Sequence, residues 1–326
     1  MSEMSRRKLL TGALVGAGGI AAAPWVWKKM QVLDQPMQRV SAFRAESYDA
    51  DLTDILIRGL AEYPHVIAKA RGGRVVLKPN LVEYSDERPV NTNSAVMSAA
   101  IAAFRAVGAR EVVVAEGPGH RRDTEILVEN TGLRRILDGL EVPFIDLNVD
   151  DVRAMTLPAN FTGFGQLMMG RTVLDADLFV SVAKLKTHHW AGATLTMKNL
   201  FGTVPGSVYG WPKNPLHYKG IDRSILDLWH AIQPGFGIID GIVGMEGDGP
   251  IMGSAKASGV MFMGDHLPAL DATAVRFMSL VPERMQYLKA STQVGATIAA
   301  SRIQVVGDRI DAQVFDVVDR FNFLRA

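Results

Sequence analysis

The sequence contains no cysteine among its 326 residues. Disulfide bonds, cysteine-ligated zinc and cysteine-held iron–sulfur clusters are therefore excluded within this chain. The lack of cysteine does not fix the compartment, because a core of this size needs no disulfide. A charge excess is lacking too, since 35 basic and 34 acidic residues leave a formal net charge of +1. The chain therefore has no strong positive electrostatic field that would favour a nucleic acid as partner.

Two common nucleotide-binding fingerprints are also missing. Gly117–Gly119 reads Gly-Pro-Gly and does not continue as G-x-G-x-x-G, and no phosphate-binding loop of the form G-x-x-x-x-G-K-[ST] occurs. Hydrophobic residues make up 48% and charged residues 21% of the chain, as in ordinary globular proteins. Without an N-terminal export segment, about 290 residues remain, enough for one large or two medium domains.

The N-terminus has the pattern of an export signal. Arg6 and Arg7 precede an uncharged run, Leu9–Trp27, that is rich in glycine and alanine. This pattern resembles a twin-arginine signal, which directs folded proteins through the twin-arginine translocase. We therefore expect residues 1–36 to be an export signal or membrane anchor and residues 37–326 to form an α/β domain.

The fate of this segment stays open at this stage. Ala21–Ala23 offers the small residues of a cleavage site, but Pro24 directly after it should hinder a signal peptidase. The uncharged run is also long enough to span a bilayer. The mature protein is therefore either periplasmic or anchored in the membrane facing the periplasm.

Beyond the export segment, strand-like apolar runs alternate with helical patterns. The predicted strands cover residues 38–44, 74–80, 111–115, 142–147, 178–182, 236–240, 259–263 and 302–307, and the predicted helices cover residues 51–70, 95–107, 123–138, 194–201, 222–232 and 265–278. Alternation at this spacing predicts a doubly wound, mostly parallel α/β sheet, as one domain or two subdomains. Residues 151–170 interrupt the alternation and predict a hairpin or other excursion.

Most of the chemistry is concentrated between Lys184 and Gly206, after the predicted strand 178–182. Ligands of open α/β folds bind beyond the carboxyl ends of the strands. The helix expected over 194–201 would add its N-terminal amides to the lysines of this stretch, so an anion site is predicted. A solvated basic loop is the alternative. It is less favoured because apolar residues interleave with the charged ones, as in a pocket wall.

Polar residues follow three further predicted strands. The four strand ends are Lys78–Asn80, Glu116–His120, Lys184–His188 and Asp240–Glu246. In a doubly wound sheet such ends converge on one edge, so we expect one shared site. A small anionic molecule would be held there by Lys78, Asn80, Glu116, Lys184 and Lys186.

Histidines and carboxylates supply the candidate catalytic and metal-binding groups. His120 and His188 could move protons near neutral pH, because the ordinary histidine pKa is about 6.5. His217 lies in a Gly/Pro/Asn-rich loop, either as part of a lid or as a solvated residue. Asp240 and Glu246 either bind a hard cation or form turns between glycines.

Several motifs resemble a bacterial and archaeal family, domain of unknown function 362. They are Lys78–Asn80, Glu116–Gly119, Lys186–His188, Met197–Gly202 and Met245–Pro250, in this order. Some members of that family carry ferredoxin-like cysteine motifs, which this chain cannot. The resemblance implies family membership without implying a reaction.

A more distant resemblance is to the nickel-pincer lactate racemases. Lys198 follows His188 at the spacing of the racemase lysine that carries the pincer nucleotide. The resemblance implies that His120 and His188 form an acid/base pair. It also implies a cofactor site at Lys198 and Asn199 and a nickel ligand at His217. The racemases have Ser-Gly-Gly before the lysine, where this chain has Thr194–Thr196. That bulk leaves open whether the same cofactor, another metal or neither is bound.

Two classes of function follow. The first is an enzyme, racemase-like or oxidoreductase-like, that acts on a small anionic substrate of the hydroxy-acid type with a histidine acid/base pair. The second is a non-catalytic protein, either a periplasmic anion binder or a membrane-tethered maturation factor. An enzyme needs the histidines, whereas a binder needs mainly the lysines.

Overall fold

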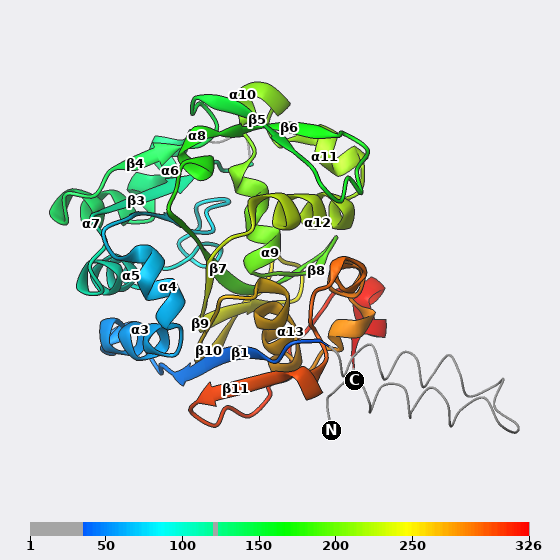
Figure 1. Ribbon diagram of the computed structural model, residues 1–326. Helices are drawn as coiled ribbons and strands as arrows, with labels where there is room; N and C mark the ends of the chain where they lie inside the picture. Colours follow the sequence, from blue (N-terminus) through cyan, green and yellow to red (C-terminus); the bar gives the residue numbers. More distant parts are fainter. Residues whose placement is uncertain (1–34, 120–122, 326) are drawn as a thin grey trace, which may run out of the picture.

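The structure is a computed structural model that describes residues 35–119 and 123–325. Within these ranges, one sheet has the strand order β11-β1-β10-β9-β7-β2-β3-β4, with β8 attached to β7 (Figure 1). The strands are β1 Gln38–Arg44, β2 Arg74–Lys78, β3 Glu111–Glu116, β4 Phe144–Asp146, β7 Leu178–His188, β8 Gly192–Thr194, β9 Phe236–Glu246, β10 Ser254–Gly264 and β11 Ile303–Gly307.

Most neighbouring strands are parallel. The run β4-β3-β2-β7-β9 is parallel throughout, and β1 is parallel to β11. Only β10, which pairs with β9 and β1, and β8, which pairs with β7, are antiparallel among the strands of the described sheet. The predicted α/β class with a mostly parallel sheet is confirmed. Residues 151–170 form a separate hairpin of β5 Val152–Thr156 and β6 Gln166–Gly170, as expected.

Helices cover both faces of the sheet. The helices are α3 Leu52–Ala61, α4 Pro64–Ala70, α5 Ser94–Ala106, α6 Thr124–Asn130, α7 Leu133–Gly139, α8 Arg171–Leu174, α9 Thr196–Asn199, α10 Gly206–Tyr209, α11 Asn214–Tyr218, α12 Ile221–Ile232, α13 Leu267–Phe277 and α14 Gln286–Ser291. Short 3-10 turns are η1 Leu200–Thr203, η2 Pro282–Arg284, η3 Thr292–Val294, η4 Ala300–Arg302 and η5 Asp319–Leu324. No helix within the described ranges has the length and apolar character needed to cross a membrane.

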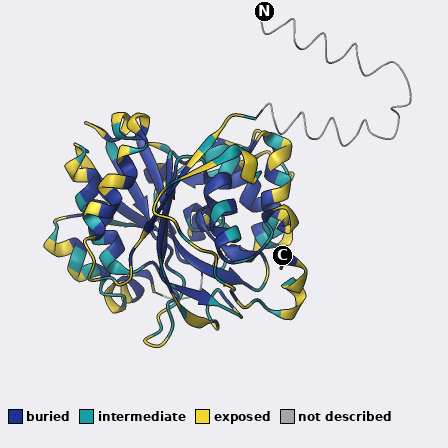
Figure 2. Ribbon diagram, turned by 90° about the horizontal axis from the view of Figure 1, so that it is seen from below, coloured by how far each residue is buried: buried dark blue, intermediate teal, exposed yellow. Residues whose placement is uncertain are grey.

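Successive side chains of a strand point to opposite faces of the sheet, so the hydrophobic core has two parts. In β2, Val75 and Leu77 pack into the cluster formed with α3, α5, α6 and α7, whereas Val76 packs into the cluster formed with α9, α12, α13 and α14. Figure 2 shows the buried strands between helices whose outer surfaces are exposed. Two faces of apolar side chains explain why these strands appear as continuous hydrophobic runs in the sequence.

Helix boundaries follow local chemistry. Asn93 and Asp123 accept hydrogen bonds from the first amides of α5 and α6, as N-caps do. The helix predicted over 51–70 is divided in two because Pro64 begins α4. The helix predicted over 123–138 is likewise divided at Gly132, which has a φ of 70°.

Strand β7 differs most from expectation. It runs to His188, well past the predicted end at Val182, because β9 continues beside it and β8 folds back along it. The stretch that was expected to be a loop is therefore a buried strand. The helix expected over 194–201 shrinks to α9 followed by η1. Residues 1–34 of the expected export segment lie outside the described residues, so that export stays a prediction.

Candidate functional site

Lys78 and Glu116, from two of the predicted strand ends, meet Asn199 of α9 in the interior. The Lys78 Nζ donates to Glu116 Oε2 at 2.7 Å, to Asn199 Oδ1 at 2.9 Å and to the Pro79 carbonyl at 2.9 Å. All three side chains are buried. Because they hydrogen-bond to one another, they stabilise this edge of the sheet. Their roles as substrate and cofactor contacts stay predictions.

The glycine of the Met197–Gly202 motif is required by this cluster. A Cβ on Gly202 would lie 1.9 Å from Glu116 Oε1 and 2.6 Å from the Lys78 Nζ. Any side chain there would collide with the buried ion pair. Asn199 completes the motif, since its Nδ2 donates to the Lys78 carbonyl and to Ser181 Oγ. The motif therefore encodes the support of a buried lysine.

A second buried ion pair joins β7 and β9. The Lys184 Nζ lies 2.9 Å from Asp240 Oδ2 and 2.8 Å from the Tyr48 Oη. The backbone N–H of Asn93 also donates to Asp240 at 3.0 Å. Lys184 and Asp240 therefore form an interior ion pair that joins two neighbouring strands. The role of Lys184 as a substrate contact stays a prediction.

The other predicted metal ligands do not join Asp240. Glu246 Oε2 accepts from the Lys256 Nζ at 2.8 Å and from the Asp316 N–H at 3.0 Å. His217 belongs to α11 and contacts neither carboxylate. In the part of the chain that the structure describes, no group of three or more histidine, aspartate and glutamate side chains could hold a metal ion. The predicted metal set of His217, Asp240 and Glu246 is corrected.

The N-terminus of α9 is also occupied by the protein itself. The backbone N–H groups of Thr196 and Met197 donate to Asp271 at 2.9 Å and 3.0 Å, and Thr196 Oγ1 donates to the same carboxylate. Burial raises the pKa of Asp271 to about 7, although the hydrogen bonds from Thr196 and Met197 lower it. The first amides of this helix are therefore unavailable to an external anion, contrary to expectation.

Lys186 is buried without a carboxylate partner among the described residues. Its Nζ donates to the carbonyls of Val90 at 2.6 Å and Pro250 at 3.3 Å. Burial, followed by the nearby Lys198 ammonium, places the pKa of Lys186 well below its ordinary value. Asn80 Oδ1 is also buried and accepts no hydrogen bond within the described ranges. The interior edge of the sheet thus carries a lysine without a counter-charge and an unused acceptor.

A group that we call the His–Lys cluster lies beyond this edge. It consists of His188, Trp190, Lys198, Phe201 and His217, from β7, the following turn, α9, η1 and α11. The Trp190 ring centroid is 6.4 Å from that of His188 and 5.8 Å from that of His217. Phe201 is 5.4 Å from His217 by the same measure, and the Lys198 Nζ is 4.0 Å from the Phe201 centroid. The rings thus link both histidines to the lysine.

The two histidines have opposite tautomers. His188 Nδ1 accepts from the backbone N–H groups of Trp190 at 2.9 Å and Ala191 at 3.3 Å, so its proton is on Nε2. His217 Nδ1 lies 3.2 Å from the Lys213 carbonyl, which can only accept, so Nδ1 carries the proton and Nε2 the lone pair. These tautomers follow from the hydrogen-bond partners. One histidine presents a donor and the other an acceptor.

Both histidines are neutral at pH 7. Burial, and then the Lys198 ammonium, lower the pKa of His188 well below its ordinary value. The same two causes, in the same order, lower the pKa of the half-buried His217. Burial also lowers the pKa of Lys198 to about 8. Apart from its contact with the Phe201 ring, the Lys198 ammonium makes no hydrogen bond to a described residue.

Lys213 is a site residue that the sequence did not indicate. Its buried Nζ donates to the carbonyls of Gly117 and Phe201, joining the loop after β3 to η1. Its own carbonyl orients His217. Burial lowers the pKa of Lys213 to about 7. A lysine in a Gly/Pro-rich loop is ordinarily solvated, so only the contacts in the fold reveal this one.

His120 is the remaining predicted histidine, and His189 directly follows His188 in the chain. His120 lies outside the described residues, so its acid/base role stays a prediction. The loop that leads to it begins at Gly117, whose carbonyl is held by Lys213. His189 is exposed and pairs with Asp248 at 3.2 Å. Of the adjacent pair, His188 is therefore the one that joins the cluster.

Known proteins similar to this chain include the thylakoid-associated protein sll1697 of Synechocystis sp. (strain ATCC 27184 / PCC 6803 / Kazusa), with 26% identity over 274 residues, covering 82% of this chain and 83% of that protein. A solved structure, the lactate racemase apoprotein of Thermoanaerobacterium thermosaccharolyticum, is similar with a TM-score of 0.49 and 15% identity over 76% of this chain. A protein of Thermotoga maritima gives a TM-score of 0.41 and 14% identity over 77%.

This chain covers 58% and 60% of the two solved proteins, less than two thirds of their length. The family model described as "Domain of unknown function (DUF362)" matches residues 75–276. This range includes both buried ion pairs and the whole His–Lys cluster. The chain therefore belongs to the DUF362 family.

Proposed function

We propose that this protein is an enzyme that transfers protons on a small anionic substrate of the hydroxy-acid type. One observation carries the proposal: His188 and His217 lie beside the Lys198 ammonium as neutral rings of opposite tautomer. The Nε2 lone pair of His217 can take a proton from the substrate. The Nε2–H of His188 can donate to an oxygen that gains negative charge, and Lys198 can hold the substrate anion.

The surrounding charges support an anionic substrate. Lys78 and Lys184 each have a carboxylate partner. Lys186, Lys198 and Lys213 have none within ion-pair distance among the described residues. Their lowered pKa values reflect the cost of burying ammonium groups. A bound carboxylate or phosphate would reduce that cost.

A cofactor on Lys198 fits the chain's own residues in one respect. The Lys198 amine has no hydrogen bond to a described residue, and its pKa of about 8 leaves part of it neutral and nucleophilic near pH 7. Thr194–Thr196, the bulkier residues before it, are buried. If a pincer nucleotide were attached there, Lys198 would carry it in place of holding the substrate anion, and the nucleotide would supply the hydride acceptor needed for racemisation or oxidation.

Exchange of the substrate C2 hydrogen for deuterium tests the proposed proton transfer. Protein from the native host, with the mass of its Lys198 peptide recorded, is incubated with a panel of 2-hydroxy acids in deuterium oxide, and exchange at C2 is followed by NMR. We expect His188→Gln and His217→Asn each to slow exchange about 100-fold or more. His65→Gln, at an exposed surface ion pair, should leave it unchanged. Full exchange by the double variant would refute the acid/base assignment.

A non-catalytic anion binder is the second candidate function, favoured by the lysines that have no carboxylate partner.

The enzyme and the binder are expected to show the same pH dependence of anion binding. Because the Lys198 pKa is about 8, the ammonium is charged below that pH and neutral above it. We expect the affinity for oxalate, measured by calorimetry, to fall as the pH rises through 8, and Lys198→Arg to remove this fall because arginine stays charged. A pH-independent affinity would contradict the role of Lys198. A binder would additionally retain its affinity without both histidines.

A further inference from the structure

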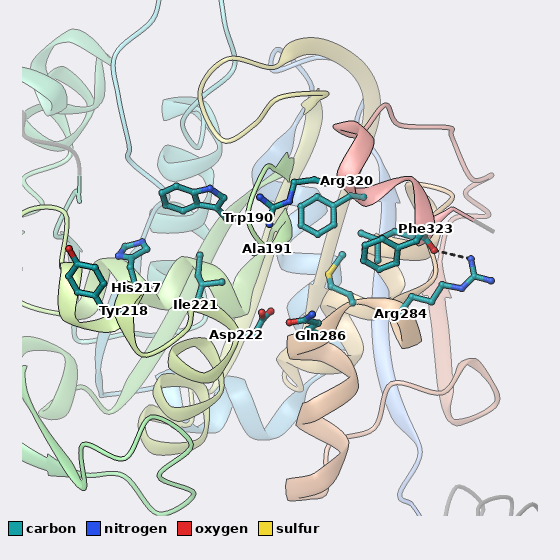
Figure 3. Close-up of a pocket in the computed structure, with 13 residues that line it drawn as sticks. Trp190, Ala191, His217, Tyr218, Ile221, Asp222, Arg284, Gln286, Arg320 and Phe323 are labelled. Carbon is teal, nitrogen blue, oxygen red and sulfur yellow. Dashed lines mark hydrogen bonds between the residues drawn. The ribbon is translucent and has the colours of Figure 1, made fainter.

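A pocket of about 570 Å³ lies beside the His–Lys cluster (Figure 3). Its walls come from the turn after β7, the α11–α12 segment, the start of α14 and the C-terminal turn η5. Trp190 and His217 line the pocket and also belong to the cluster. The volume falls in the range of small-molecule sites. The pocket is therefore larger than a simple hydroxy acid requires, and His217 is the proposed reacting group in its wall.

Aromatic rings in this pocket remain largely uncovered. Trp190 is 53% exposed and Phe323 is 52% exposed. Figure 3 shows these two rings on opposite sides of the pocket, with Arg320 between them in this view. Covering ring surface with a ligand is favourable in proportion to the apolar area removed from water. A flat apolar body fits these walls.

Two guanidinium groups give the pocket its charge. Arg320 lies 5.1 Å from the Phe321 ring centroid and has no carboxylate partner among the described residues. Arg284 donates from Nη1 to the carbonyls of Phe323 and Arg325, which fixes its plane and leaves Nη2 without a partner in the described ranges. Guanidinium groups held in this way recognise carboxylate or phosphate oxygens.

Asp222 is the carboxylate of the pocket lining, and it sits away from Arg320 beside Gln286 (Figure 3). It accepts the backbone N–H of Tyr287, and burial raises its pKa. Asp222 therefore does not neutralise the guanidinium groups. An anionic group of a ligand would be directed to Arg320, away from Asp222.

We infer that this pocket binds an aromatic carboxylate, with its ring against Trp190 and its carboxylate on Arg320. The inference rests on the proposed function in one part, the placement of the reacting hydroxy acid at His217. The substrate class is thus a dianion, with a hydroxy-acid group at one end of an aromatic body and a second anionic group at the other.

Calorimetry with the full chain tests this inference, using para-carboxymandelate and mandelate as matched probes. We expect para-carboxymandelate to bind about tenfold more tightly than mandelate, because only it offers the second carboxylate. Arg320→Gln should abolish that preference. Arg309→Gln, at a fully exposed arginine after β11, is the control and should keep it.

The variants separate the pocket from the reaction. If Lys198→Met weakens both probes equally while the preference survives, the pocket is upheld and the anion site at Lys198 is supported independently. If the preference survives in Lys198→Met with no loss of affinity, the pocket is upheld and the proposed role of Lys198 fails. Equal affinity for the two probes, no binding of either, or a preference unchanged in Arg320→Gln would overturn the pocket assignment.

Discussion

Replacing Glu116 by alanine is expected to lower the free energy of unfolding by about 3–5 kcal/mol. The Lys78 ammonium would remain in the interior without a counter-charge. Glu116 also accepts the backbone N–H groups of Leu81 at 3.0 Å and Gly117 at 2.8 Å, which would lose their acceptor. Urea unfolding followed by circular dichroism measures the change.

Glu111 provides the matched control for this result. It pairs with Arg74 at 3.3 Å, but the two side chains are 44% and 26% exposed. An ion pair of this kind contributes about 0–1 kcal/mol. Should Glu116→Ala fail to fold, Lys78→Met with Glu116→Leu removes both charges and should recover much of the stability. Equal losses for Glu116→Ala and Glu111→Ala would contradict the burial argument.

Replacing Gly249 by alanine is expected to destabilise the protein by about 1–3 kcal/mol or more and to displace His188. A Cβ on Gly249 would lie 2.1 Å from the Thr187 carbonyl oxygen, a backbone atom of β7 that cannot rotate away. The loop is fixed against β7 on both sides, because His189 donates to the Gly249 carbonyl at 2.8 Å and Thr187 to the Gly247 carbonyl at 2.9 Å.

Gly247→Ala separates a steric effect from a conformational one. Gly247 has a φ of 80° and open space around its Cβ position, so alanine there costs only about 1–2 kcal/mol of backbone strain. We expect thermal unfolding to show the larger loss for Gly249→Ala. Only Gly249→Ala should shift the His188 ring resonances in a proton–nitrogen spectrum. A larger effect at Gly247 would show that the loop is not held against β7.

Sequence patterns predicted the parts of the fold that depend on neighbouring residues. The starts of the helices after Asn93 and Asp123 were predicted within one or two residues, because their N-cap side chains act on the next few amides. The sheet class followed from the alternation of strands and helices. The meeting of Lys78 and Glu116 also followed, since parallel strands end on one edge.

The sequence-based predictions failed where residues far apart in the chain determine the local structure. Lys184 was expected in a loop, yet β9 supplies Asp240 and extends the strand past it. The α9 amides were expected to be free, yet Asp271 from α13 occupies them. Lys213 was overlooked because its partners, Gly117 and Phe201, come from other segments. Partners so far apart in sequence leave no local pattern.

The position of β1 has a consequence for how the chain folds. β1 contains the first described strand residues, yet it lies between β10 and β11, pairing Ser41 with Met263 and Gln38 with Ile303. During synthesis, this strand has no sheet neighbour until nearly the whole chain has left the ribosome. Such long sequence separations slow folding, because the loop must close before the contacts form. A truncation that removes β11 should therefore leave the first strand with an open edge that invites aggregation.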